Sequence, residues 1–199
     1  MFRLLLGYTL VAFCLFNSDS ASAARGGRTH VYLLRGIADV SVGLDVLAAK
    51  LAGRGIAASV HSHGDAALVA GKAIGDYKSG RLGSIILIGH SLGAGAILST
   101  ARQLDDAGVP VMLLIALDPV WSGTVSPNVK RAVNFYVSGS GVALGTAPAF
   151  RANLRNVDVS GPGMNHMAVQ ATNQMHNRII GLVRTVGARR RTTPLGDKK

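Results

Sequence analysis

The chain has 199 residues, a length that fits one domain with a sizeable core and leaves little room for a second. Its 21 lysines and arginines outnumber 10 acidic residues, but no aromatic residues interleave the basic C-terminal cluster, which argues against specific nucleic-acid binding. All acidic residues are aspartates, so any catalytic carboxylate is an aspartate.

The first residues are typical of a secretory signal peptide. Arg3 precedes an apolar run from Leu4 to Phe16, and small residues then lead to Ala21-Ser22-Ala23, an A-x-A cleavage site. We expect cleavage after Ala23 and a secreted or periplasmic protein, with an uncleaved anchor as the alternative. Because the single cysteine, Cys14, lies in this segment, the mature chain would have no disulfide and no thiol nucleophile.

Short apolar runs alternate with helical patterns from residue 30 onward. The predicted strands cover residues 31–34, 56–60, 85–88, 111–117, 132–137 and 154–159, and the predicted helices cover residues 39–53, 65–77, 92–106 and 166–186. The run 111–117 is the longest, which favours a central strand buried on both faces. The alternation predicts a three-layer α/β fold, with a mostly parallel central sheet and helices on both faces.

The domain is expected to cover residues 24–187, and residues 188–199 are expected to form a flexible basic tail. The tail contains Arg189-Arg190-Arg191 and Lys198-Lys199. A solvated terminus is the favoured interpretation, and weak contact with an anionic surface is the functional alternative.

One motif carries chemistry: Gly89-His90-Ser91-Leu92-Gly93, which lies directly between an apolar strand and a helical pattern. It matches G-x-S-x-G, in which a serine occupies a sharp, strained turn and the residues two positions away must lack bulky side chains. Gly89 and Gly93 meet that need, and the Leu92 N–H points to where an oxyanion would form. The motif predicts a nucleophilic Ser91, with a purely structural glycine-rich turn as the alternative.

A serine nucleophile needs a base, because its free hydroxyl is hardly ionised at neutral pH. His90 adjoins the serine and is expected to pack beneath the turn. Three histidines precede the serine, opposite to the usual chain order for such a turn: His30, His61 and His63. His166 lies in a loop after the last predicted strand and just before the last helix. It is therefore favoured as the base over His176, which falls within that helix.

Two aspartates compete for the third position, which orients the histidine. Asp118 ends the run 111–117 and is followed by Pro119, whereas Asp158 lies within the last predicted strand. Both satisfy the order Ser, Asp, His. Asp118 is favoured because the start of a loop matches the sheet edge better, and Asp158 remains the rival acid.

The second oxyanion donor is expected from the loop after the first strand, where Ile37 follows Arg35 and Gly36. No cofactor is expected, because the glycines of the loop 139–148 miss the dinucleotide spacing. No metal is expected either, because the His61-x-His63 pair lacks a third ligand at convincing spacing.

The Gly-His-Ser91-Leu-Gly motif, followed by Asp118 after the next strand, resembles the α/β-hydrolase superfamily, in particular its small thioesterase- and lipase-like members. The resemblance covers about residues 30 to 187. It departs from many esterases in having Arg35-Gly36 in place of a His-Gly-Gly oxyanion motif, and the short connections leave room for at most a minimal lid.

The sequence therefore predicts a serine hydrolase that cleaves an ester or thioester through an acyl-enzyme intermediate, acting on a small-molecule or lipid substrate. An exported location favours oxygen esters over acyl-CoA. The alternative is a catalytically inactive α/β-hydrolase-like binding protein of the cell envelope, because fold alone does not secure function.

Overall fold

The computed structural model describes residues 28–191, with the burial of side chains described through residue 186. The expected signal peptide, residues 1–23, lies outside the described residues, as does the end of the basic tail from residue 192. Within the described part of the chain, no helix combines the length and the apolarity needed to cross a bilayer.

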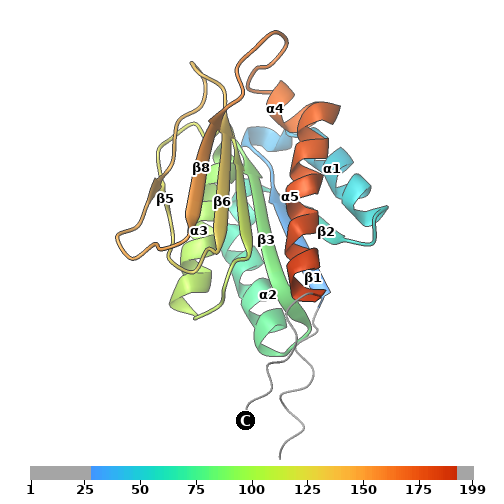
Figure 1. Ribbon diagram of the computed structural model, residues 1–199, viewed down its shortest axis with the longest axis vertical. Coiled ribbons are helices and arrows are strands. Elements are labelled where there is room, and N and C mark those ends of the chain that lie inside the picture. The colour runs from blue at the N-terminus through green and yellow to red at the C-terminus, as the bar shows by residue number, and fades with distance from the viewer. Residues whose placement is uncertain (1–27, 192–199) are drawn as a thin grey trace, which may run out of the picture.

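Six parallel strands form the central sheet (Figure 1), in the order β2-β1-β3-β4-β6-β8. Their bounds are β1 Arg28–Leu34, β2 Ala57–His61, β3 Leu82–His90, β4 Leu113–Leu117, β6 Arg131–Tyr136 and β8 Asn153–Asp158. All five residues of β4 are buried, so the prediction of a central strand covered on both faces is confirmed. Two short strands, β5 Thr124–Val125 and β7 Gly145–Thr146, pair separately beside the main sheet.

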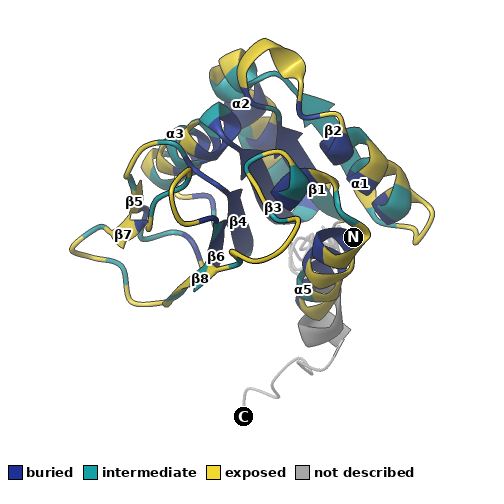
Figure 2. Ribbon diagram, turned by 90° about the horizontal axis from the view of Figure 1, so that it is seen from above, coloured by how far each residue is buried: buried dark blue, intermediate teal, exposed yellow. Residues whose placement is uncertain are grey.

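Helices cover both faces of the sheet. α1 (Gly43–Ala52), α4 (Ala168–Ala171) and α5 (Asn173–Arg191) lie on one face, and α2 (Ala66–Lys78) and α3 (Leu92–Asp106) on the other. Alternate residues of each strand feed the two cores, since successive side chains point to opposite faces. In β1, for example, Val31 and Leu33 join the first core, and Tyr32 and Leu34 join the second. Figure 2 shows the buried sheet between these layers, which confirms the predicted three-layer α/β arrangement.

The prediction of a helix beginning at Asp39 is wrong. Ala38 and Asp39 have φ values of 49° and 55°, which an α-helix does not allow, and residues Ile37–Asp39 form only one short 3-10 turn. α1 begins at Gly43 instead. The irregular segment places Ser41 under the neighbouring loop, where its hydroxyl accepts a hydrogen bond from the Gly36 N–H at 2.9 Å.

The prediction of one continuous helix from His166 to Val186 is also wrong. Thr172 has an extended ψ of 145°, which separates α4 from α5, and α5 continues to Arg191. His166 lies in the turn before α4, where the Asn165 side chain caps the N–H groups of Met167 and Ala168 at 3.0 and 2.9 Å. This turn, rather than a helix, directs the His166 imidazole toward the sheet.

Candidate active site

The site lies where the order of the strands reverses. The chain passes from β1 outward to β2 and then returns to β3 on the other side of β1, so the loops that leave β1 and β3 diverge. Ligands of open parallel sheets bind in the crevice outside the carboxyl ends of the strands at this point. Gly36 follows β1, Ser91 follows β3 and Asp118 follows the adjacent strand β4, so all three meet at this edge.

The turn at Ser91 is strained in the way the motif predicts. Ser91 has φ 58° and ψ −120°, a conformation that residues with side chains rarely adopt. A Cβ at Gly89 would lie 2.1 Å from the carbonyl oxygen of Gly93, and a Cβ at Gly93 would lie 2.0 Å from that of Leu34. Since both obstacles are backbone atoms, neither position accommodates a side chain. The turn is anchored by the Ser91 N–H, which donates to the Leu117 carbonyl at 3.0 Å.

Ser91, His166 and Asp118 come together in one hydrogen-bonded chain. His166 Nε2 lies 3.0 Å from the Ser91 hydroxyl oxygen, and His166 Nδ1 lies 2.6 Å from Asp118 Oδ2. A carboxylate only accepts, so Nδ1 carries the proton and Nε2 is free to accept from the serine. The Asp118 side chain is fully buried, whereas that of His166 is 31% exposed and faces the opening of the site. This geometry suits proton transfer from Ser91 to His166.

The loop after β6 holds the Asp118 carboxylate. Oδ1 accepts from the Val137 N–H at 2.6 Å, and Oδ2 accepts from the Ser140 hydroxyl at 2.6 Å. Gly141 packs against the same carboxylate, since a Cβ there would lie 1.9 Å from Oδ1. The sequence predicts a mobile surface loop near the active edge over residues 139–148, but no motif marks Ser140 or Gly141, because their contacts with Asp118 join segments more than twenty residues apart.

The two rival residues, Asp158 and His176, do not belong to the hydrogen-bonded chain of Ser91, His166 and Asp118. Asp158 is exposed, and hydrogen bonds from Ser138 and Ser160 lower the pKa of its carboxyl to about 2. His176 lies at the start of α5, where its Nε2 contacts the Gln170 carbonyl at 2.9 Å, and burial lowers the pKa of its imidazole. The Asp158 carboxylate and the His176 imidazole are thus bound elsewhere.

His90 packs beneath the turn and ties two loops together. Its Nε2 donates to the His166 carbonyl oxygen at 2.8 Å, because a carbonyl only accepts. Its Nδ1 therefore accepts from the Ser41 hydroxyl at 2.7 Å, and the Ser41 oxygen accepts in turn from the Gly36 N–H. The His90 imidazole thus links the loop after β1 to the loop of His166, while the two histidine rings lie 4.7 Å apart. Ser41 carried no recognisable signal in the sequence.

Stability is expected to fall as the pH drops from about 6.5 to about 4. Burial lowers the pKa of His90 to about 4, so the folded protein keeps this residue neutral where the unfolded chain protonates it. The unfolded state then binds more protons, and the free energy of unfolding decreases by about 3 kcal/mol from His90 across this window.

Urea unfolding at pH 7.0, 5.5 and 4.0 measures this effect. The variant His90→Asn should show a flatter pH dependence than the wild type, with a residual slope of the same sign from His30, His61 and His176, whose pKa values burial also lowers. An unchanged slope in the variant would mean that His90 is not neutral in the folded protein.

Two backbone N–H groups near Ser91 are the expected oxyanion donors, those of Leu92 and Ile37. Leu92 is the first residue of α3, so its N–H has no acceptor within the helix. Ile37 follows Gly36, where a Cβ would lie 3.0 Å from the Ser91 Cβ. Within the described residues, neither N–H donates a hydrogen bond. Both N–H groups thus lack a protein acceptor among these residues, and the role of oxyanion donor stays a prediction for each of them.

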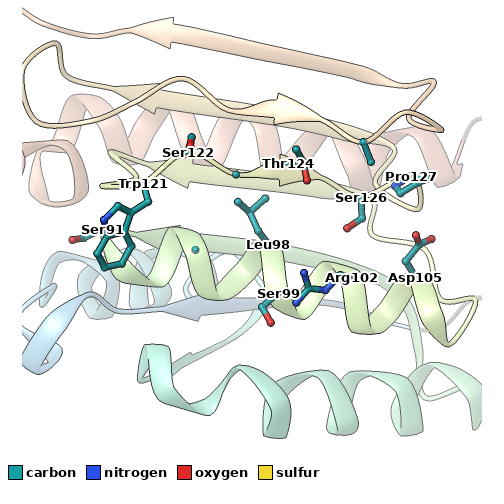
Figure 3. Close-up of a pocket in the computed structure, with 13 residues that line it drawn as sticks. Ser91, Leu98, Ser99, Arg102, Asp105, Trp121, Ser122, Thr124, Ser126 and Pro127 are labelled. Carbon is teal, nitrogen blue, oxygen red and sulfur yellow. The ribbon is translucent and has the colours of Figure 1, made fainter.

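A groove of about 550 Å³ leads away from Ser91 between α3 and the β5 segment. Figure 3 shows Ser91 beside Trp121 at one end, Leu98 in the middle, and Arg102 and Asp105 toward the other end. Hydroxyl side chains complete much of the lining: Ser99, Ser122, Thr124 and Ser126. The Trp121 side chain is 70% exposed, so an aromatic surface is available beside the serine.

Metal-binding groups do not assemble in the part of the chain that the structure describes. No three histidine, cysteine or acidic side chains among residues 28–186 lie close enough together to hold an ion. His61 contacts Ser59, and His63 contacts the Gly36 carbonyl, so the two side chains point to different partners.

These observations define an α/β-hydrolase fold with a serine at the strand-to-helix turn of its switch point. No protein-family model matches the chain, and no curated protein matches its sequence. Solved structures do match the fold. The thioesterase RedJ from the prodiginine biosynthetic pathway of Streptomyces coelicolor has a TM-score of 0.54 and 11% identity, with 81% of this chain and 87% of that chain covered.

Two further structures extend the likeness. Human thioesterase 2 has a TM-score of 0.52 and 9% identity, with 80% of this chain and 96% of that chain covered. A protein assigned to the alpha/beta hydrolase superfamily, from Xanthomonas campestris pv. campestris, has a TM-score of 0.50 and 16% identity, with 79% and 99% covered. At these identities the likeness establishes the shared fold, which is the fold that the Ser91 motif predicts.

Proposed function

We propose that the protein is a serine hydrolase that cleaves an ester or thioester through an acyl-enzyme intermediate. The observation that carries this proposal is the hydrogen-bonded chain from Ser91 through His166 to the buried Asp118, which opens onto a groove. The similarity in fold to thioesterases of known structure supports the same reaction type.

The reaction begins with attack of Ser91 Oγ on the carbonyl carbon of the substrate. The serine proton passes to His166 Nε2, and Asp118 stabilises the resulting imidazolium through Nδ1–H. The negative charge on the former carbonyl oxygen is stabilised by the N–H groups of Leu92 and Ile37. Collapse of this intermediate breaks the bond to the alcohol or thiol, which leaves with the proton from His166 and gives the acyl-enzyme.

Water then completes the cycle. His166 Nε2 takes a proton from the attacking water, and the second tetrahedral intermediate releases the carboxylic acid and restores Ser91. His90 acts in this scheme as a positioning residue: it holds the backbone of His166 and, through Ser41, the loop that carries Ile37.

The length of the groove suits an extended substrate. Ser91 and Arg102 lie eleven residues apart along α3, which corresponds to about 16 Å at 1.5 Å per residue. Trp121 and Leu98 offer apolar contact to the part of the substrate near the serine, whereas Arg102 and the hydroxyl groups suit a polar portion farther away. The expected export of the protein would place oxygen esters ahead of acyl-CoA as its natural substrates.

A panel of p-nitrophenyl esters and matched acyl thioesters of increasing chain length tests this function. We expect the wild type to turn over members of this panel and His166→Ala to show no turnover. The variant Leu98→Trp narrows the groove, so its preference for acyl chain length should shift. Turnover by His166→Ala at the wild-type rate would contradict the mechanism. Absence of turnover across the panel, together with an unreactive Ser91, would favour the inactive binding protein.

A further inference from the structure

A second groove lies on the opposite face of the sheet, away from the Ser91 groove. It has a volume of about 310 Å³ and is bordered by β6, β8 and α5. In Figure 1, α5 lies beside β6 and β8 rather than across them. The connection between these two strands packs on the other face, where Leu144 joins the core formed with α2 and α3. Among residues 28–191, no second helix therefore covers this part of the sheet.

The floor of the groove is apolar. Val133 and Phe135 of β6, Val157 of β8 and Leu182 of α5 line it. The two β6 residues are each only 3% exposed and belong to the core beneath α5. Val157 and Leu182 are partly exposed, so they offer the apolar surface that favours contact with hydrocarbon over contact with a fully polar ligand.

Three arginines surround this floor, each from a different element: Arg131 from β6, Arg155 from β8 and Arg178 from α5. The alternation of side chains between the two faces of each strand places Arg131 and Arg155 beside the groove. Arg131 shares a face with Val133, and Arg155 lies opposite Val133 in the strand register. The three positive charges repel one another because they line one small groove. A bound anion would reduce this repulsion, so the groove favours an anionic ligand.

These arginines have no carboxylate partner among the side chains that the structure describes. No aspartate lines the groove, and none of the three forms an ion pair within residues 28–186. Arg131 makes one long contact of 3.5 Å to the Thr185 hydroxyl, and the Arg178 guanidinium lies 4.7 Å from the centre of the Phe135 ring. By contrast, Arg35 and Arg81 are each paired with an aspartate.

We propose that this groove binds an amphiphile with a phosphate monoester head and a single alkyl chain. A guanidinium binds two phosphate oxygens at once, and a head group with nearly two negative charges matches three arginines that line one groove better than a monoanion does. The first methylene groups of the chain would lie on Val157 and Leu182, the partly exposed apolar residues of the lining. A volume near 300 Å³ is at the lower end for ligand pockets and suits one chain rather than two. The proposal does not depend on Ser91 being catalytic.

Calorimetric titration of the purified protein with monododecyl phosphate, kept below its critical micelle concentration, tests the proposal. Arg178→Gln and Arg155→Gln should each weaken binding roughly tenfold or more, the scale of a lost charge-assisted hydrogen bond. The matched control is Arg184→Gln, an exposed arginine of the same helix outside the groove, which should bind within twofold of wild type. Inorganic phosphate and neutral dodecyl maltoside should each bind at least tenfold more weakly than the alkyl phosphate.

A further variant, Leu98→Asp, changes the groove beside Ser91 and not the groove of the three arginines. Its affinity for monododecyl phosphate should equal that of the wild type. Several results would overturn the proposal: no binding to the wild type, equal losses in Arg184→Gln and Arg178→Gln, or a loss confined to Leu98→Asp. Equal affinity for inorganic phosphate and dodecyl phosphate would also overturn it, because the apolar floor would then contribute nothing. Circular dichroism of each variant confirms that a lost affinity is not a lost fold.

Discussion

Replacing Ser91 by alanine is expected to lower kcat/KM by at least about 10⁴-fold while the protein stays folded, since a triad without its nucleophile retains only the contribution of binding and the oxyanion donors. The alanine keeps the Cβ and needs the same strained backbone, so the stability should change little. Rates with the best ester of the panel, with circular dichroism and the thermal midpoint measured beside them, provide the test.

The matched control for this variant is Ser122→Ala, which removes a hydroxyl from the same groove but not from the hydrogen-bonded chain. Its kcat/KM should remain within a few-fold of wild type. If Ser91→Ala and Ser122→Ala lost activity equally, the hydrolysis would not depend on a serine nucleophile at the turn.

The second large effect is expected for Asp118→Asn, which should lower kcat by roughly 10³- to 10⁴-fold. An amide at this position can donate to His166 Nδ1, so it favours the tautomer that carries the proton on Nε2 and cannot accept one from Ser91. The amide also no longer stabilises an imidazolium. Steady-state kinetics at saturating substrate measure the loss.

Asp158→Asn is the matched control, because Asp158 is the rival acid and its carboxylate is bound by Ser138 and Ser160 instead of His166. It should leave kcat unchanged. Near-normal activity in Asp118→Asn, or a large loss in Asp158→Asn, would reverse the assignment of the acid. A thermal midpoint for each variant separates a catalytic loss from unfolding, since Asp118 is buried.

Much of the fold follows from local patterns that the sequence carries directly. The apolar runs that became β1, β3 and β4 are buried almost throughout, and their alternation with helical patterns predicts a covered parallel sheet. The positions of Gly89 and Gly93 predict the sharp turn at Ser91, because the turn leaves no room for a Cβ at either residue. Such requirements are imposed within a few residues, so a single sequence reveals them.

Other features depend on contacts between distant segments and leave no local pattern. The helix expected from Asp39 gives way to an irregular loop because Ser41 is held by Gly36 and His90. The groove of three arginines assembles from β6, β8 and α5, and successive arginines of the groove lie more than twenty residues apart along the chain. Neither periodicity nor a motif marks these positions.

The central claim is that Ser91 is an activated nucleophile, and reaction with a fluorescent fluorophosphonate tests it most directly. The purified wild type, Ser91→Ala and His166→Ala would be treated in parallel, and the labelled peptide identified by mass spectrometry. We expect one adduct on Ser91 in the wild type and none in either variant, because His166 must take the serine proton. A folded wild type that stays unlabelled, or an adduct on Ser91 that forms equally fast in His166→Ala, would contradict the proposed mechanism.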